Sequence, residues 1–227
     1  MDVELIYIFD DEAGRDTLCI RGDLYKYLIK VRRHKKGDEL YFRAKQNLEI
    51  LHRYKIESVE PRSAELSLLF SKKEEIKSTK SLHLGWCVID SNSIEKVLPS
   101  LCETGVERIS FIFCDRSQKN FKLDFKRFER ILEASMQQCG RSTYIEFDTY
   151  KNIEEFVTKF PDVNVFDFCQ NALQDYSGIK RVLIGCEGGF SDKERELLSS
   201  LKTFRLDTPM VLRSESAVAA IAAKILL

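Results

Sequence analysis

One short stretch constrains the fold more than any other: residues 181–191, which read Arg-Val-Leu-Ile-Gly-Cys-Glu-Gly-Gly-Phe-Ser. Residues 182–184 form an apolar run of the kind that makes a buried strand. The three glycines that follow allow a sharp turn and let another molecule approach the backbone closely. The sequence Ser191-Asp-Lys-Glu194 is a capping box, which predicts that a helix begins there. A strand, a glycine turn and a helix start in succession indicate an α/β protein with a small-ligand site.

This pattern alone leaves several interpretations open. An ordinary tight turn in an α/β sheet is one of them, and a nucleotide-type cofactor site is another. In a dinucleotide-binding fold, Asp207 would be the ribose-binding acid, about 20 residues after the turn. However, Gly185-Cys-Glu-Gly-Gly189 is not G-x-G-x-x-G, and too little chain follows it to complete a doubly wound sheet. The phosphate-binding motif G-x-x-x-x-G-K-[ST] is absent from the sequence.

A second stretch, residues 210–217, reads Met-Val-Leu-Arg-Ser-Glu-Ser-Ala. It predicts a bend followed by the last helix, with Ser214 as the N-cap. Residues 217–227 are apolar nearly all round apart from Lys224, so this helix is expected to be buried on more than one side.

The first seventy residues predict β structure. Residues 24–31 interrupt it with an apolar spacing of three and four, which predicts a short amphipathic helix. Short strands joined by turns are typical of a small β-barrel or OB-like sheet. The strands are expected at 5–9, 17–20, 39–42, 49–59 and 64–70.

The polar residues 71–80 indicate a boundary between domains, which we place between residues 1–72 and 73–227. Beyond it, strands and helices alternate, which predicts a mainly parallel α/β sheet. A helix is expected between a Ser93 cap and Gly105, with Pro99 kinking it or delaying its start. The expected strands are 82–89, 109–114, 143–147, 163–168, 181–184 and 203–206, and the other helices are 124–139, 153–160, 192–201 and 217–227.

Charge and cysteine content restrict the function classes. The 36 basic residues are balanced by 36 acidic ones, so any nucleic-acid surface must be local. The seven cysteines are scattered singly and there are three histidines, which argues against a metal site. Dispersed cysteines indicate reduced thiols and a cytoplasmic location. No apolar run reaches the length of a membrane span, so no membrane partner is expected.

The two motifs together resemble the ribosomal RNA small subunit methyltransferase E family, which belongs to the knotted SPOUT class. The family patterns are I-G-P-E-G-G and L-R-x-E-T-A, matched here by residues 184–189 and 212–217, with Cys186 in place of the proline. Asp207-Thr208 stands where the family usually has leucine and glycine. The resemblance covers nearly the whole chain. It implies S-adenosylmethionine as cofactor and N3 of a uridine in 16S ribosomal RNA of the small ribosomal subunit as target.

The resemblance also implies the architecture. A PUA-like barrel that binds RNA is expected first, followed by a SPOUT domain with a C-terminal trefoil knot, and the enzyme is expected to be a homodimer. The loops after the strands at 163–168, 181–184 and 203–206 would wrap a bent cofactor. The residues implied for cofactor binding are Phe168, Ile184, Gly185, Glu187, Gly188, Gly189, Leu206, Asp207, Val211, Leu212, Arg213 and Ser216.

Arginines are the candidates for catalysis, because a guanidinium can hold the anion that uridine becomes when it loses its N3 proton. Arg213 lies in the second motif, where an ion pair with Glu187 or Glu215 is the structural alternative. Arg116 and Arg141 match family arginines and are expected to contact RNA as well. No general base is identified.

Residues 26–36 hold six lysines or arginines and no acid. A solvated helix face is the plain interpretation, and contact with RNA phosphates is the one we favour. The stretch also resembles the family's barrel signature, H-x-x-x-V-L-R-x-x-x-G-D. The residues expected to bind RNA here are Lys30, Arg32, Arg33 and Lys35. Two other functions stay open: a SPOUT RNA methyltransferase with a different target base, and a non-catalytic RNA-binding or ribosome-assembly protein.

Overall fold

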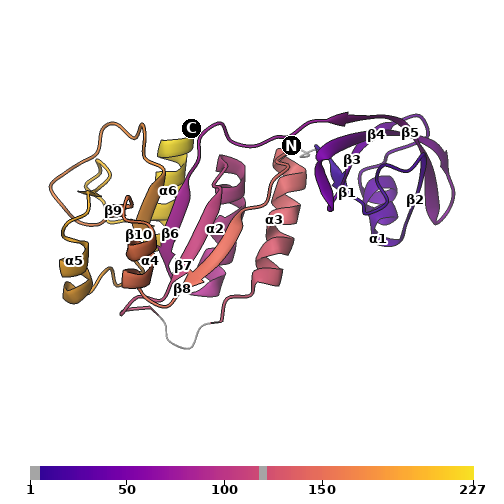
Figure 1. Cartoon of the computed structure of the whole chain (residues 1–227). Coiled ribbons are helices and arrows are strands. Elements are labelled where there is room, and N and C mark those ends of the chain that lie inside the picture. Colours follow the sequence, from indigo (N-terminus) through magenta and orange to yellow (C-terminus); the bar gives the residue numbers. More distant parts are fainter. Residues whose placement is uncertain (1–5, 118–121) are drawn as a thin grey trace. The chain divides into compact units, whose positions relative to one another are not determined.

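The computed structural model describes residues 6–117 and 122–227. Contacts divide the chain into two compact units (Figure 1). The first extends to Lys77 and includes Met136–Thr143, and the second comprises Ser78–Ser135 and Tyr144–Leu227. The sequence placed the boundary at residues 72 and 73 and did not anticipate that a later segment belongs to the first unit.

A five-stranded sheet that curls around an apolar core forms the first unit (Figure 1). Its spatial order is β1-β3-β4-β5-β2, and every pair is antiparallel except β1 with β3. Two register shifts between β4 and β5 bend the long strands, as bulges do. The strands are β1 (Ile8–Phe9), β2 (Thr17–Arg21), β3 (Glu39–Ala44), β4 (Asn47–Val59) and β5 (Ser63–Lys73).

Two of the predictions for this unit need correction. The predicted strand at 5–9 is only β1 in the structure, and residue 5 lies outside the described residues. The predicted helix over 24–31 begins as α1 (Gly22–Tyr25) and continues as a π-helix, η1 (Lys26–Val31). The wider winding ends with the N–H of Arg32 donating to the carbonyl oxygen of Tyr27 at 2.9 Å.

The second unit is built on a six-stranded parallel sheet, as the alternation of strands and helices predicted. The spatial order is β11-β9-β10-β6-β7-β8, so the carboxyl ends of all six strands share one edge. The strands are β6 (His83–Cys87), β7 (Arg108–Ile112), β8 (Glu146–Tyr150), β9 (Asn164–Phe166), β10 (Arg181–Ile184) and β11 (Thr203–Phe204).

The predicted strand at 143–147 was placed too early, because β8 begins at Glu146. The backbone just before β8 bonds to a different segment: the N–H of Ser142 donates to the carbonyl oxygen of Ile76 at 2.9 Å. The Ser142 hydroxyl in turn accepts the N–H of Ile76 at 2.7 Å. These bonds hold residues 142 and 76 together in the first unit, so the strand starts only after them.

Among the residues that the structure describes, five helices accompany the sheet: α2 (Ser91–Thr104), α3 (Phe125–Cys139), α4 (Ile153–Lys159), α5 (Asp192–Leu198) and α6 (Ser214–Leu226). The glycine stops of α2 and α3 are confirmed, with φ of 95° at Gly105 and 86° at Gly140. The predicted Ser93 cap was wrong. Asp90 is the N-cap of α2, and its carboxylate accepts the N–H of Ser93 at 3.0 Å. Pro99 lies inside α2 and does not delay its start.

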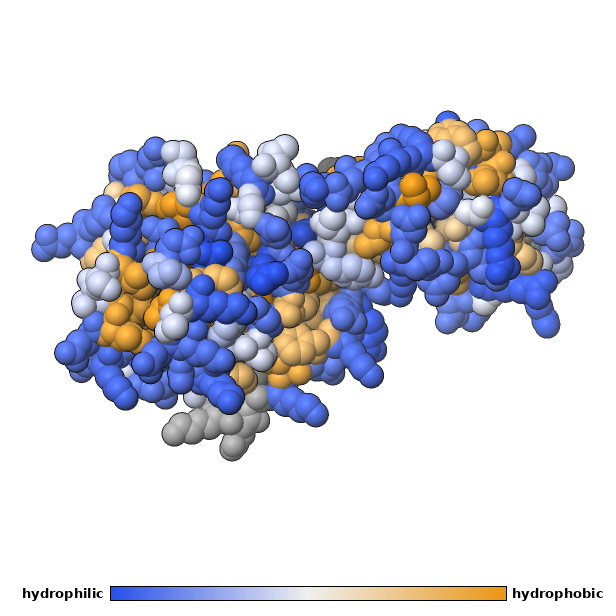
Figure 2. Space-filling view, viewed as in Figure 1, coloured by the Kyte–Doolittle hydropathy of each residue, from blue (hydrophilic) through white to orange (hydrophobic). Residues whose placement is uncertain are grey.

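The apolar residues are mostly in the two cores, and the face seen in Figure 2 is largely hydrophilic with separate hydrophobic patches. In the described part of the chain, no helix combines the length and the apolar character needed to cross a membrane. Helix α6 packs against α2 and β10.

Candidate functional site

A cavity of about 700 Å³ opens at the carboxyl ends of β9, β10 and β11. Ligand sites in parallel α/β sheets lie at this edge, and this volume is typical of sites for small molecules. Three chain segments, Arg195 of α5 and the start of α6 form the wall. The lining residues are Phe166–Phe168, Ile184–Phe190, Arg195, Arg205–Leu212, Ser214 and Ala217.

The glycine turn after β10 folds tightly upon itself at the floor of this cavity. Gly189 has a φ of 65°, and its N–H donates to the carbonyl oxygen of Cys186 at 2.9 Å. A Cβ at Gly185 would lie 3.3 Å from the Cα of Gly189, too close for most side chains. The turn therefore favours glycine at 189 through its φ and at 185 through tight packing, and the close approach of another molecule stays a prediction.

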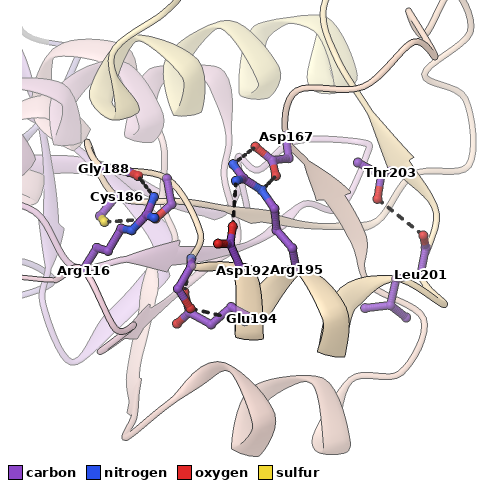
Figure 3. A network of polar contacts seen from close by, with 11 residues as sticks. Arg116, Asp167, Cys186, Gly188, Asp192, Glu194, Arg195, Leu201 and Thr203 are labelled. Carbon is purple, nitrogen blue, oxygen red and sulfur yellow. Dashed lines mark hydrogen bonds and ion pairs between the residues drawn. The ribbon is translucent and has the colours of Figure 1, made fainter.

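A side chain from another loop packs on the same turn. The Nη1 of Arg116 donates to the carbonyl oxygen of Gly188 at 2.6 Å (Figure 3). A Cβ at Gly188 would meet side-chain carbons of Arg116 at 3.3 and 3.4 Å. At Gly188 it is thus the packing of Arg116 rather than the φ that favours glycine, and a larger residue there would shift this arginine.

The buried carboxylate of Glu194 ties the glycine turn to the loop after β7. It accepts the N–H of Ser191 at 2.8 Å, which completes the predicted capping box of α5, and the N–H of Asp115 at 2.8 Å. The Ser191 hydroxyl donates to the Asp115 carboxylate at 2.6 Å. Three separate bonds therefore fix the position of the turn relative to the end of β7.

An ion pair at the cavity wall was not anticipated from the sequence. Arg195, on α5, donates from Nε to the carboxylate of Asp167 at 2.8 Å and from Nη2 at 3.3 Å (Figure 3). This bond to Asp167 raises the pKa of Arg195. Asp167 directly follows β9 in the structure, whereas the predicted strand 163–168 included it, so no pattern in the sequence marked this residue.

Ser214 has a different role from the predicted one. It is the first residue of α6, and Arg213 occupies the N-cap position without a side-chain cap. The Ser214 hydroxyl donates to the carbonyl oxygen of Gly185 at 2.6 Å and accepts the indole N–H of Trp86 at 2.8 Å. These bonds join the start of α6 to the glycine turn and to β6, so the two sequence motifs meet at one place.

Most residues predicted to bind a cofactor surround the cavity. Arg213 and Ser216 do not line it, and both are exposed. The ten that line it are Phe168, Ile184, Gly185, Glu187, Gly188, Gly189, Leu206, Asp207, Val211 and Leu212.

The arginines expected to act in catalysis lie in different settings. Arg116 is exposed and contacts the glycine turn, and Arg213 directly follows Leu212 of the cavity wall. Arg141 belongs to the first unit, where it is buried and its Nε donates to the carbonyl oxygen of Thr143 at 2.6 Å. The structure therefore places Arg116 and Arg213 beside the cavity and gives Arg141 a structural contact.

Of the residues expected to bind RNA near the predicted first helix, Lys30 lies within η1, and Arg32, Arg33 and Lys35 follow it. The amine of Lys30 lies 5.6 Å from the ring centre of Tyr25, and the guanidinium of Arg32 lies 5.8 Å from that of Tyr27. Arg33 and Lys35 are exposed, and Arg33 has a φ of 63°, which is rare for a residue with a side chain. Within residues 6–117 and 122–227, no group of three or more histidine, cysteine or acidic side chains could hold a metal ion.

Comparisons with known proteins identify relatives over the whole length. Residues 76–226 match the model of a family described as an RNA methyltransferase domain. The chain is 36% identical to ribosomal RNA small subunit methyltransferase E of Helicobacter pylori strain J99, over 93% of this chain and 95% of that protein. It is 24% identical to ribosomal RNA small subunit methyltransferase E 2 of Borreliella burgdorferi, over 91% and 89% of the two chains.

Solved structures share the fold. A methyltransferase from Legionella pneumophila with bound S-adenosylmethionine superimposes with a TM-score of 0.76, at 22% identity, over 99% of this chain and 97% of that one. Ribosomal RNA small subunit methyltransferase E from Neisseria gonorrhoeae, bound to S-adenosyl methionine, gives a TM-score of 0.73 at 19% identity, over 97% and 96%.

Proposed function

The chain belongs to the ribosomal RNA small subunit methyltransferase E family, and on this premise we propose that it transfers a methyl group from S-adenosylmethionine to N3 of a uridine in 16S ribosomal RNA. The observation that carries the proposal is the convergence of both sequence motifs on one cavity. The glycine turn forms its floor, residues Leu206–Leu212 form a wall, and Ser214 bonds the two together.

The cavity suits this cofactor on physical grounds. Its volume of about 700 Å³ accommodates a small molecule, and its wall combines apolar side chains such as Phe166 and Leu206 with exposed backbone of the turn. Glycine at 185 and 189 keeps side chains away from that backbone. Asp167 and Arg195 neutralise one another at the rim, so the wall offers a hydrogen-bonding surface without a net charge from this pair.

The cofactor, when bound, supplies an electrophilic methyl group, and the remaining requirement is a correctly placed uridine anion. Positioning of this kind contributes several kcal/mol, up to about 7–11 in favourable cases. Arg116 uses one of its five N–H donors on Gly188, so others stay available for a uracil oxygen or an RNA phosphate. Arg213, at the edge of the wall, is the second candidate for holding the uracil oxygens. Arg141 stays a candidate for RNA contact, although its Nε is already bonded to Thr143.

The proposal extends to the architecture. We propose that the loops after β9, β10 and β11 form the C-terminal trefoil knot of the SPOUT class, and that the first unit is a PUA-like RNA-binding barrel. The apolar length of α6 supports a homodimer with the helix at the interface. A cytoplasmic location follows from the ribosomal RNA substrate.

Nucleoside mass spectrometry tests the reaction. We expect 16S ribosomal RNA from a strain lacking the gene to gain 3-methyluridine after incubation with the protein and S-adenosylmethionine. Methylation of another base would contradict the uridine assignment, and absence of any methyl transfer would favour a non-catalytic RNA-binding role. Gly189→Val is expected to abolish transfer, because a branched residue at a φ of 65° distorts the cavity floor.

Gly178→Val is the matched control. Gly178 also has a positive φ, of 77°, but it does not line the cavity, and a Cβ at this position would meet nothing within 4 Å. The variant is expected to keep transfer, so that loss in both variants would show general destabilisation instead of a damaged cofactor site.

A further inference from the structure

Three of the seven cysteines meet where three neighbouring strands end. Cys87 is the last residue of β6, Cys114 follows β7 by two residues, and Cys186 follows β10 by two residues. Because β10, β6 and β7 are adjacent in the sheet, their carboxyl ends bring these thiols together. The sulfur atoms of Cys114 and Cys186 lie 3.5 Å apart. All three side chains are buried, and Cys186 lines the cavity.

We propose that Cys114 and Cys186 are a redox-sensitive pair that a hydroperoxide converts to a disulfide, and that this bond weakens cofactor binding in the adjacent cavity. The second half of this inference rests on the proposed function, whereas the first half does not.

The geometry requires only a small movement. A disulfide joins its sulfur atoms at about 2.05 Å, so the two thiols must approach by roughly 1.5 Å. The contacts of both sulfur atoms are hydrogen bonds: Cys186 donates to the carbonyl oxygen of Gly189 at 3.6 Å, and Cys114 contacts the Ser117 hydroxyl at 3.1 Å. Rotation of the two side chains and a slight shift of the turn can therefore close the gap.

The surroundings of Cys114 and Cys186 give the two thiols different chemical roles. Contact with the thiols of Cys186 and Cys87 lowers the pKa of Cys114, and a contact with the Ser117 hydroxyl adds to this effect. The contact with Cys114 and burial raise the pKa of Cys186. The thiolate, not the thiol, attacks a peroxide. Cys114 is consequently the attacking group, and Cys186, which lines the cavity, is the resolving one.

The reaction balances in two steps. The Cys114 sulfur attacks one peroxide oxygen, the O–O bond breaks, and a sulfenic acid and one molecule of water or alcohol form. The Cys186 thiol then attacks the Cys114 sulfur, the S–S bond forms, and the sulfenic oxygen leaves as water with the thiol proton. The two thiols are oxidised and the hydroperoxide is reduced. An external thiol reverses the change by exchange.

The expected consequence follows from the position of Cys186. It lies between Gly185 and Glu187, which both line the cavity, and its carbonyl oxygen accepts the N–H of Gly189. A covalent bond to the end of β7 would draw this turn away from the cavity. The floor on which the cofactor rests would then change shape.

The test uses the reduced full-length chain treated with hydrogen peroxide. Free thiols are alkylated, the linked peptides are identified by mass spectrometry, and S-adenosylmethionine affinity is measured by calorimetry before oxidation, after it, and after reduction by dithiothreitol. We expect a Cys114–Cys186 linkage and a loss of affinity of about tenfold or more that reduction reverses.

Two variants serve as controls. Cys114→Ser cannot form the bond and should keep its affinity in peroxide, with Cys114→Ala as a substitute if serine impairs folding. Cys19→Ser, at an exposed cysteine of the first unit, should respond like the unaltered chain.

A linkage between other cysteines, a disulfide that leaves affinity unchanged, or an equal loss of affinity in Cys114→Ser would each overturn the inference. Failure of the reduced chain to bind S-adenosylmethionine would instead count against the proposed function, and the linked peptides would still show whether the pair forms.

Discussion

At the scale of single residues, Glu194 connects the proposed cofactor site to the loop after β7. Its two carboxylate oxygens accept N–H groups from Ser191 and Asp115. Glu194→Gln would turn an amide N–H₂ toward one of these donors, leaving it without an acceptor. We expect a loss of about 1–3 kcal/mol in the free energy of unfolding, measured by denaturant titration.

Helix α5, which contains Glu194, also provides a matched control. Glu196→Gln changes an exposed glutamate and should leave stability unchanged. Equal stability of the two variants would show that Glu194 does not hold the turn. A lower affinity for S-adenosylmethionine in Glu194→Gln, but not in Glu196→Gln, would show that the hydrogen bonds of Glu194 support the cavity.

Residue patterns predicted a large part of the site. In the glycine turn, the backbone conformation depends on local residue type, as the positive φ of Gly189 shows. Such residues could therefore be recognised in the sequence. The Asp167–Arg195 pair and the bond from Trp86 to Ser214 could not, because each joins residues that only the folded sheet brings together. Ser214 was predicted to be a cap for the same reason, since its partners, Trp86 on β6 and Gly185 just after β10, are distant in the sequence.

At the scale of elements, the start of α2 gives a direct test of capping. Asp90→Ala removes the acceptor for the N–H of Ser93 and should lower the free energy of unfolding by about 1 kcal/mol. Asp90→Asn keeps an acceptor and should retain most of that stability. A larger cost for Ser93→Ala than for Asp90→Ala in thermal unfolding would restore the serine as the effective cap.

Apolar patterns predicted the existence and type of most elements, although β1, β9 and β11 are shorter than the predicted strands. They did not predict the π-helical winding of η1, in which Leu28 is buried as it would be in the expected amphipathic helix. Nor could they predict where β8 begins, because the backbone N–H of Ser142, just before this strand, bonds to the carbonyl oxygen of Ile76. Sequence patterns therefore misplaced the ends of elements where long-range hydrogen bonds override the local preference of the chain.

At the scale of the whole molecule, a formal net charge of zero means that RNA affinity must come from local basic segments. Replacing Arg32, Arg33 and Lys35 together with glutamine should reduce the salt dependence of RNA binding. Three lost phosphate contacts would lower the slope of log K against log salt by about 2. Filter binding at several salt concentrations measures this slope.

Three lysines elsewhere in the first unit provide the control for the triple replacement. Lys72, Lys73 and Lys77 each pair with a glutamate, so their replacement by glutamine removes the same charge away from the proposed RNA surface. An equal change of slope in both triple variants would contradict a specific role for residues 32–35.

The central claim is that the cavity at the ends of β9, β10 and β11 holds the methyl donor. A crystal structure of the chain with S-adenosylmethionine tests it most directly. We predict that the cofactor lies against the Gly185–Gly189 turn and the wall from Leu206 to Leu212. A cofactor bound elsewhere on the chain, with this cavity vacant, would contradict the account.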